Sequence, residues 1–86
     1  FPGYRVCIFS DNGPEAREGA FAARKLFEET FPGVKVCMGY DIPYFKVSVG
    51  NCLTTEEAII LKERVSATFP KAFVKNETLS IADLLN

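Results

Sequence analysis

The sequence contains no histidine, and its three cysteines have neither an even count nor a Cys-x-x-Cys spacing. Histidine is a frequent general base and metal ligand in proteins. Without histidine, the cysteines lack the second residue type that completes many metal sites and catalytic dyads. We therefore expect no metal and no cofactor. An odd number of cysteines also argues against a disulfide framework.

An excess of positive charge is lacking as well. Ten Lys and Arg residues stand against eleven Asp and Glu residues, which gives a formal net charge of −1. Phosphate binding relies on clustered Lys and Arg, so we expect no nucleic-acid partner. No apolar run approaches the ~20 residues of a membrane span, so we expect no direct membrane insertion by this segment.

The start of the chain has no signal-peptide pattern. We expect residues 1–3 to be the remnant of a linker, residues 4–76 to form one domain, and residues 77–86 to be a C-terminal tail. Any targeting information is expected outside this segment. An apolar content of 48% and a charged content of 24% are typical of a globular domain that folds alone.

Apolar and polar residues alternate over 4–10, 34–38, 44–50 and 72–75, which predicts four strands. The strand 44–50 is the best delimited, because turn residues precede it and Gly50-Asn51 follows it. Its alternation directs Phe45, Val47 and Val49 to a core. The other side presents Tyr44, Lys46 and Ser48.

Apolar residues three or four apart predict helices over 14–31 and 55–69. Thr54 and Glu57 have the spacing of a capping box, and Ser80 and Asp83 have that of a further cap in the tail. The tail is expected as a short helix or as an extended wrap, in either case covering Ile59 and Ile60. The apolar stripes are Ala16, Ala20, Ala23, Phe27 and Phe31 in the first helix and Ala58, Leu61, Val65 and Phe69 in the second.

The two halves of the chain share a strand-helix-strand plan. Phe31-Pro32 precedes one strand as Phe69-Pro70 precedes another, and Arg5-Val6 recurs as Lys46-Val47. This order predicts an α+β fold of the βαββαβ, ferredoxin-like or RNP-like type. We expect a four-stranded antiparallel sheet in the order 4-1-3-2, with both helices on one face.

The other face of the sheet is expected to be open. Rings stack on the C–H faces of sugars, and Lys, Arg and Ser bind hydroxyl and amide oxygens, so this mixed surface suits a carbohydrate. Composition alone is equally consistent with a face that is only solvated. The open face is expected to carry Arg5, Cys7, Lys35, Cys37, Tyr44, Lys46, Ser48, Phe73 and Lys75.

Several segments in order resemble the SPOR (sporulation-related repeat) domain. They are Tyr4-Arg5-Val6-Cys7-Ile8, an alanine-rich helix, Tyr44-Phe45-Lys46-Val47-Ser48-Val49-Gly50, Thr55-Glu56-Glu57-Ala58 and Ala72-Phe73-Val74. The Pro43-Tyr44 and Phe69-Pro70 contexts are most similar to versions from the Bacteroidetes. The match spans about residues 4–75. Each segment alone is weak, whereas their order and spacing together are moderately specific.

The resemblance implies an RNP-like fold that binds peptidoglycan, specifically glycan strands without stem peptides. Such domains direct their parent proteins to the division septum, which implies a periplasmic or cell-envelope location within a larger exported or membrane-anchored protein. By position, the family's glycan contacts fall on Ser10, Tyr44, Lys46 and Phe73. A monomer or a weak dimer is expected.

One position departs from the family pattern. Cys7 stands where many SPOR domains have glutamine, and a thiol does not offer the donors and acceptor of an amide. Glycan contacts are then expected to shift towards Tyr44, Lys46 and Ser48. In the oxidising periplasm Cys7 and Cys37 would lie two strand spacings apart, about 9.5 Å. This exceeds the ~7 Å limit for a disulfide, so we expect free thiols.

Three other functions compete with glycan binding. A peptidoglycan hydrolase needs paired carboxylates, but Glu28-Glu29 and Glu56-Glu57 are adjacent on helices and Asp41 stands alone, so we expect no enzyme. An RNA-binding module needs stacking rings where strand one has Cys7. A protein-protein interaction or dimerisation module that buries Tyr44 and Phe73 of the open face remains the alternative.

Overall fold

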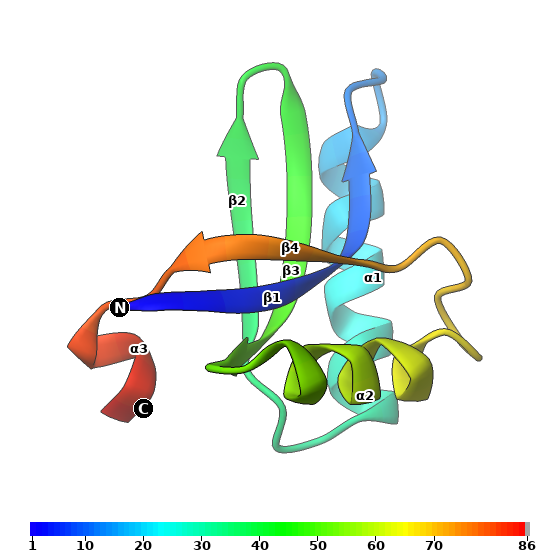
Figure 1. The fold of residues 1–86 in the computed structure, drawn as a ribbon. Helices are drawn as coiled ribbons and strands as arrows, with labels where there is room; N and C mark the ends of the chain where they lie inside the picture. The colour runs from blue at the N-terminus through cyan, green and yellow to red at the C-terminus, as the bar shows by residue number, and fades with distance from the viewer. Residues whose placement is uncertain (86) are drawn as a thin grey trace.

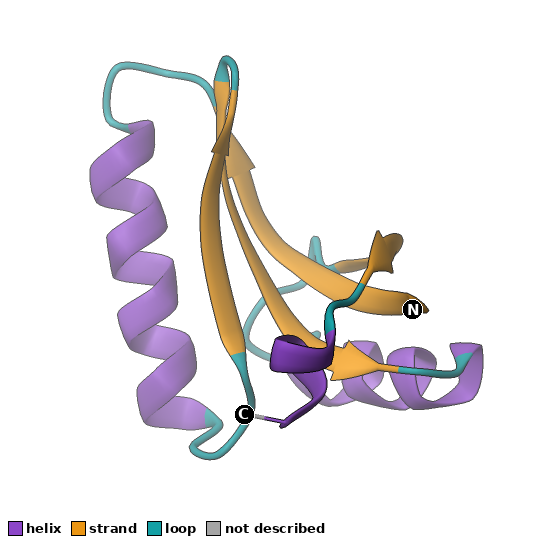
Figure 2. Cartoon of the chain, turned by 90° about the vertical axis from the view of Figure 1, so that its left-hand side faces the viewer, coloured by secondary structure: helices purple, strands orange, loops and turns teal. Residues whose placement is uncertain are grey.

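One antiparallel sheet and three helices make up the computed structural model, which describes residues 1–85 (Figures 1 and 2). The strand order β2-β3-β1-β4 is the predicted order 4-1-3-2 read from the opposite edge, so the predicted fold is confirmed. The elements are β1 (Pro2–Asp11), α1 (Ala16–Thr30), β2 (Val36–Asp41), β3 (Tyr44–Cys52), α2 (Thr55–Val65), β4 (Phe73–Thr78) and α3 (Ile81–Leu85).

The core lies between one face of the sheet and the helices α1 and α2. Val6, Val47 and Val49 are fully buried there, as period-two alternation predicts. The rings of Phe27 and Phe69 lie 6.1 Å apart between centroids and join the two helical regions. The predicted stripes are confirmed, because their members are buried or packed against this core: Ala16, Ala20, Ala23, Phe27, Phe31, Ala58, Leu61, Val65 and Phe69.

The sheet bends, and β1 carries the irregularities that allow it. The pairing of β1 with β3 shifts register twice, between Tyr4 and Val6 and between Cys7 and Phe9. Such bulges bend a strand and increase its twist. Figure 1 shows the result, because β1 first runs beside β4 and then turns upward along β3. Gly50 lies at the first shift with φ +77°, a conformation that favours glycine.

Helix ends and turns differ slightly from expectation. The Oγ1 of Thr54 accepts the N–H of Glu57 at 3.2 Å, which confirms one half of the predicted capping box, whereas the Glu57 carboxylate accepts from the Thr54 hydroxyl and not from its backbone N–H. Helix α2 ends at Val65 rather than Phe69, because the N–H groups of Thr68 and Phe69 both donate to the C=O of Val65 and close a turn. Helix α1 begins two residues after Pro14. The hairpin between β2 and β3 turns through Ile42 and a cis Pro43.

Within residues 1–3, which were expected as a linker remnant, Pro2 and Gly3 are part of the sheet. Pro2 and Gly3 pair with Thr78 and Glu77. The ammonium of Phe1 donates to the C=O of Leu79 at 2.7 Å, and the N–H of Leu79 donates to the C=O of Phe1 at 2.7 Å. The cause is that β4 continues to Thr78, beyond the short strand predicted at 72–75, and so gives these residues a partner.

The tail forms α3 but does not cover α2. The N–H of Ser80 donates to Asp83 at 2.8 Å, and the N–H of Asp83 donates to the Oγ of Ser80 at 3.1 Å, so the predicted cap is confirmed. Helix α3 packs at one end of the open face, whereas Ile59 and Ile60 stay exposed. The expectation that the tail covers them is wrong. None of the helices in residues 1–85 combines the length and apolar character of a membrane span.

Candidate functional site

Strand register brings the predicted site residues together on the open face. Cys7 lies opposite Ser48 on β3 and opposite Phe73 on β4. Ser10 lies opposite Lys46. Tyr44, Lys46 and Ser48 share one side of β3 at period two. The six positions therefore form one continuous surface, although Cys7 on β1 and Phe73 on β4 are more than sixty positions apart in the sequence.

Four of the six are accessible to a ligand. The Tyr44 and Phe73 side chains are 41% and 49% exposed, and Ser10 is also exposed. The Nζ of Lys46 lies 3.1 Å from the Oδ2 of Asp41 and 6.0 Å from the centre of the Tyr44 ring. The β2–β3 hairpin thus presents an aromatic ring with a cation and a carboxylate beside it.

Cys7 and Ser48 are less accessible than the sequence predicts, at 2% and 4% exposure. Both point away from the helices, but they occupy one row across the bent sheet between Cys37 on β2 and Phe73 on β4. The Sγ of Cys7 donates to the C=O of Phe9 at 3.4 Å, within the second register shift of β1. Their neighbours on the curved face cover them, so they form the floor of the site.

The open face is concave, since residues of both edge strands line the same recess. A hollow of about 240 Å³ is bordered by Cys37 and Asp41 on β2, Lys46 and Ser48 on β3, and Lys75 and Glu77 on β4. A second hollow, of about 460 Å³, lies on the other side of β1. It is bordered by Cys7, Ser10, Lys71 and Phe73.

Arg5 fastens α3 to one end of this face, and this cluster was not predicted. Its Nη1 lies 3.4 Å from Glu77, its Nη2 lies 3.4 Å from Asp83, and its Nε donates to the Oδ1 of Asn51 at 3.1 Å. The Nδ2 of Asn51 in turn donates to the C=O of Asp83 at 2.7 Å. The guanidinium was expected to be free on the open face, but Arg5 is only 8% exposed.

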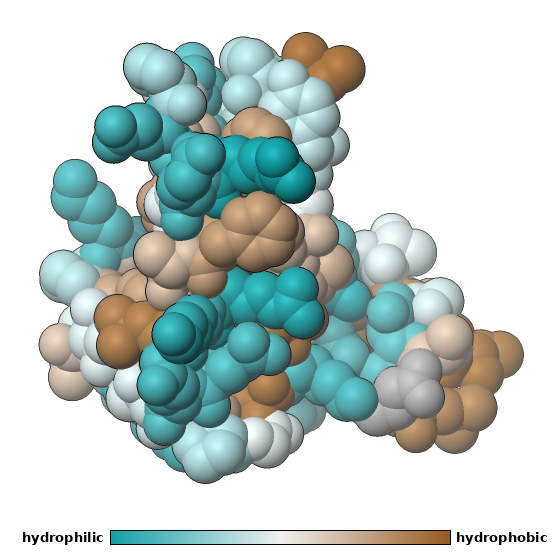
Figure 3. All heavy atoms as spheres, turned by 180° about the vertical axis from the view of Figure 1, so that it is seen from behind, coloured by the Kyte–Doolittle hydropathy of each residue, from teal (hydrophilic) through white to brown (hydrophobic). Residues whose placement is uncertain are grey.

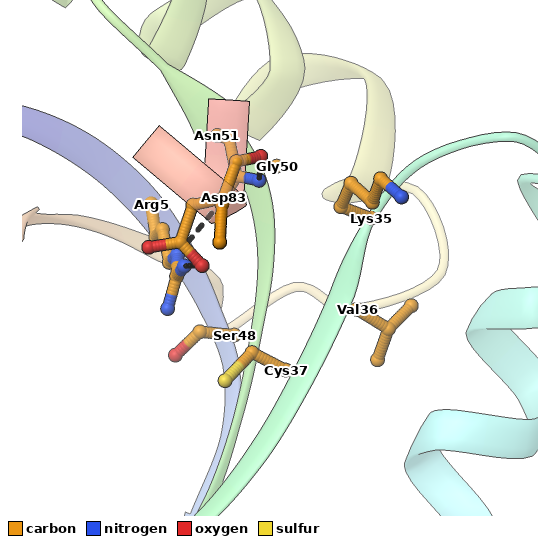
Figure 4. Close-up of a pocket in the computed structure, with 9 residues that line it drawn as sticks. Arg5, Lys35, Val36, Cys37, Ser48, Gly50, Asn51 and Asp83 are labelled. Carbon is orange, nitrogen blue, oxygen red and sulfur yellow. Dashed lines mark hydrogen bonds and ion pairs between the residues drawn. The ribbon is translucent and has the colours of Figure 1, made fainter. Parts of the chain in front are cut away.

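Figure 4 shows that this cluster borders a third recess, of about 190 Å³. Arg5, Ser48 and Cys37 point towards the same space, whereas Lys35 and Val36 point away from it. The N–H and then the hydroxyl of Ser80, followed by the guanidinium of Arg5, lower the pKa of the Asp83 carboxyl. Arg5 pairs with residues more than seventy positions away, and such pairs produce no periodic pattern in the sequence. Only the Ser80-Asp83 spacing indicated structure in this region.

The cysteines are free, and Cys7 and Cys37 lie on either side of Ser48 as predicted. Cys37 is exposed, whereas Cys7 and Cys52 are buried. Burial and then the carboxylate of Glu57 raise the pKa of the Cys52 thiol. Within residues 1–85 no three Cys, Asp or Glu side chains are grouped so that they could hold a metal ion.

Exposed apolar side chains also lie on α1 and α3. Ile81 and Leu85 on α3 are exposed, and Figure 3, which views the molecule from behind, shows brown spheres at the lower right, where α3 lies. Phe21 is exposed on α1, and the guanidinium of Arg17 lies 5.6 Å from its ring centre. The chain therefore offers a second cation-ring pair, on a surface that the helices form.

Comparison of the chain with protein-family models, with curated proteins and with solved structures finds no match.

Proposed function

We propose that this chain is a non-catalytic module that binds the glycan strands of bacterial peptidoglycan, favouring strands without stem peptides. In this proposal it directs its parent protein to the cell wall or the division septum, and it acts in the periplasm as part of a larger exported or membrane-anchored protein. The observation that carries the proposal is an accessible ring beside an ammonium and a hydroxyl on a concave sheet face, on the side opposite α1 and α2.

The chemistry of this surface suits a sugar chain. The Tyr44 ring offers an apolar face to the C–H groups of a pyranose, and Lys46 with Ser10 offers donors to hydroxyl and amide oxygens. Phe73 offers a second ring across β1. Since Lys46 already pairs with Asp41, the surface is close to neutral and favours a polar ligand over a polyanion.

The absence of catalysis is part of the proposal. Three carboxylates that border the concave face are paired with cations: Asp41 with Lys46, and Glu77 and Asp83 with Arg5. A glycosidase needs one protonated and one ionised carboxyl group on opposite sides of a bond. Hydrogen bonds from Ser80, and then the guanidinium of Arg5, lower the pKa of Asp83 and favour its ionised state, which supports binding rather than acid-base chemistry.

The test is co-sedimentation with purified sacculi from which an amidase has removed the stem peptides. We expect Tyr44→Ala and Lys46→Glu to weaken binding by about tenfold or more, since each removes a direct contact. Both side chains are partly exposed, so the thermal transition should hardly move. Phe21→Ala is the matched control, because it removes an equally exposed ring from the other cation-ring pair.

Two results would reject the proposal. One is a wild-type chain that does not sediment with amidase-treated sacculi. The other is a loss of binding that is as large for Phe21→Ala as for Tyr44→Ala. If Tyr44→Ala instead abolishes self-association of the chain, the open face serves protein-protein contact, which is the alternative function.

A further inference from the structure

Between the charged residues Lys35 and Asp41, the free edge of β2 lacks the features that usually protect a sheet edge. Exposed edge strands commonly carry charges, proline or a bulge, which prevent pairing with another chain. Residues 36–40 read Val-Cys-Met-Gly-Tyr, and their pairing with β3 is regular throughout. The other edge strand, β4, carries Lys75 and Glu77. Figure 2 views the molecule from the β2 side, and no helix crosses this strand.

The backbone groups on this edge have a defined pattern. The N–H of Gly50 donates to the C=O of Lys35 at 2.8 Å, so Lys35 directs its peptide groups towards β3. Alternate residues of an antiparallel strand point to the same neighbour. Cys37 and Gly39 therefore also bond towards β3. The N–H and C=O groups of Val36, Met38 and Tyr40 point away from the sheet.

We propose that a second copy of this chain pairs with this edge, β2 against β2 in antiparallel orientation, about a two-fold axis at Met38. In this register Met38 lies opposite Met38 of the second copy, and Val36 lies opposite Tyr40. All three residues direct their peptide groups outward, so about six hydrogen bonds join the two strands. A peptide of unrelated sequence would satisfy the same groups, but the side chains favour a second copy.

The side chains match in this register and in no neighbouring one. Lys35, directly before β2, falls opposite Asp41 of the second copy, and the symmetry repeats this pair. Val36 falls opposite Tyr40 on the helix side, a β-branched and aromatic pair that stabilises sheets. Gly39 leaves room opposite Cys37. A register centred on residue 37 or 39 would separate Lys35 from Asp41 and leave peptide groups without partners.

The dimer would join both sheets into one, with the open faces on the same side, because side chains alternate in step across a continuous sheet. Two copies of the proposed glycan site would then face one direction. The pairing itself does not depend on glycan binding. An edge contact of this length is small, so we expect a dissociation constant on the order of 100 μM.

Sedimentation equilibrium of the whole chain up to about 1 mM tests the pairing. We expect Lys35→Glu to weaken the dimer about tenfold, and Asp41→Lys likewise, since each replaces two opposite-charge pairs with like-charge pairs. The double variant Lys35→Glu/Asp41→Lys should restore the wild-type dissociation constant. Lys71→Glu, a charge reversal on an exposed residue outside β2, should leave it unchanged.

Cross-linking tests the register. Cys37 and Gly39 of the second copy form a non-hydrogen-bonded pair, with Cα atoms about 4.5 Å apart, within the range of a disulfide. Gly39→Cys should therefore give a covalent dimer with copper phenanthroline, whereas wild type and Cys37→Ser/Gly39→Cys should not. A wild-type monomer at 1 mM, a dimer that the charge reversals do not affect, or no cross-link in Gly39→Cys would each overturn the proposal.

Discussion

Replacement of Arg5 tests most directly which contacts connect α3 to the strands of the open face. Its guanidinium bonds to β3 through Asn51, to β4 through Glu77 and to α3 through Asp83. Removing one partner of a fully buried ion pair costs about 3–5 kcal/mol. Here the Glu77 and Asp83 side chains are 33% and 35% exposed, so water can solvate these carboxylates when Arg5 is replaced.

For Arg5→Met we therefore expect a loss of about 2 kcal/mol in the free energy of unfolding, with methionine retaining most of the packing of the arginine stem. At a urea m-value of about 1 kcal/mol/M this lowers the unfolding midpoint by ~2 M. Amide exchange in residues 81–85 should also accelerate, because α3 loses its anchor.

Arg24→Met is the control for this prediction. Arg24 pairs with Glu28 at 3.7 Å on the surface of α1, where such pairs contribute about 0.5 kcal/mol or less. Equal midpoints for Arg5→Met and Arg24→Met would refute the role given to Arg5. Unchanged exchange in residues 81–85 would refute the claim that Arg5 fastens α3.

Three further predictions follow from local structure. Gly50→Ala should cost about 2–3 kcal/mol in urea denaturation, because it places a side chain at φ +77° against Leu61. At pH 8, iodoacetamide should label Cys37 first, because Cys52 is buried and its pKa is raised; all three thiols should react in urea without reductant. The pKa of Asp83 is lowered from its usual 3.8. The ionised carboxylate should therefore stabilise α3 above about pH 4, and this stabilisation should disappear as the pH falls through the pKa of Asp83 in the folded protein. Amide exchange in α3 measures this change.

Strand and helix patterns were predictable because each element buries one face. Val47 and Val49 on β3, and Phe27 on α1, follow the periods of two and of three to four residues that burial imposes. The ends of β1 and β4 were not predictable, since Pro2 and Gly3 become a strand only through their pairing with residues 77 and 78. Proline and glycine by themselves indicate a loop.

The side of the sheet that carries the candidate site was predictable, but the burial of the residues at the bottom of the site was not. Alternation places Tyr44, Lys46, Ser48 and Cys7 on the side opposite α1 and α2, and the register confirms that Cys7 lies beside Ser48. Burial of Cys7 and Ser48 depends on the bulges of β1, which curve the sheet. A bulge inserts one residue without a distinct sequence pattern, so alternation alone predicts a flatter and more exposed floor than the structure has.

The most direct test of the central claim is an NMR titration of the labelled chain with two glycan preparations, one free of stem peptides and one that carries them. If the open face binds glycan, the amides of Ser10, Tyr44, Lys46 and Phe73 should shift with peptide-free strands and shift less with peptide-bearing strands, and that of Phe21 should not shift. Shifts confined to the helices, or none with peptide-free strands at millimolar concentration, would contradict it.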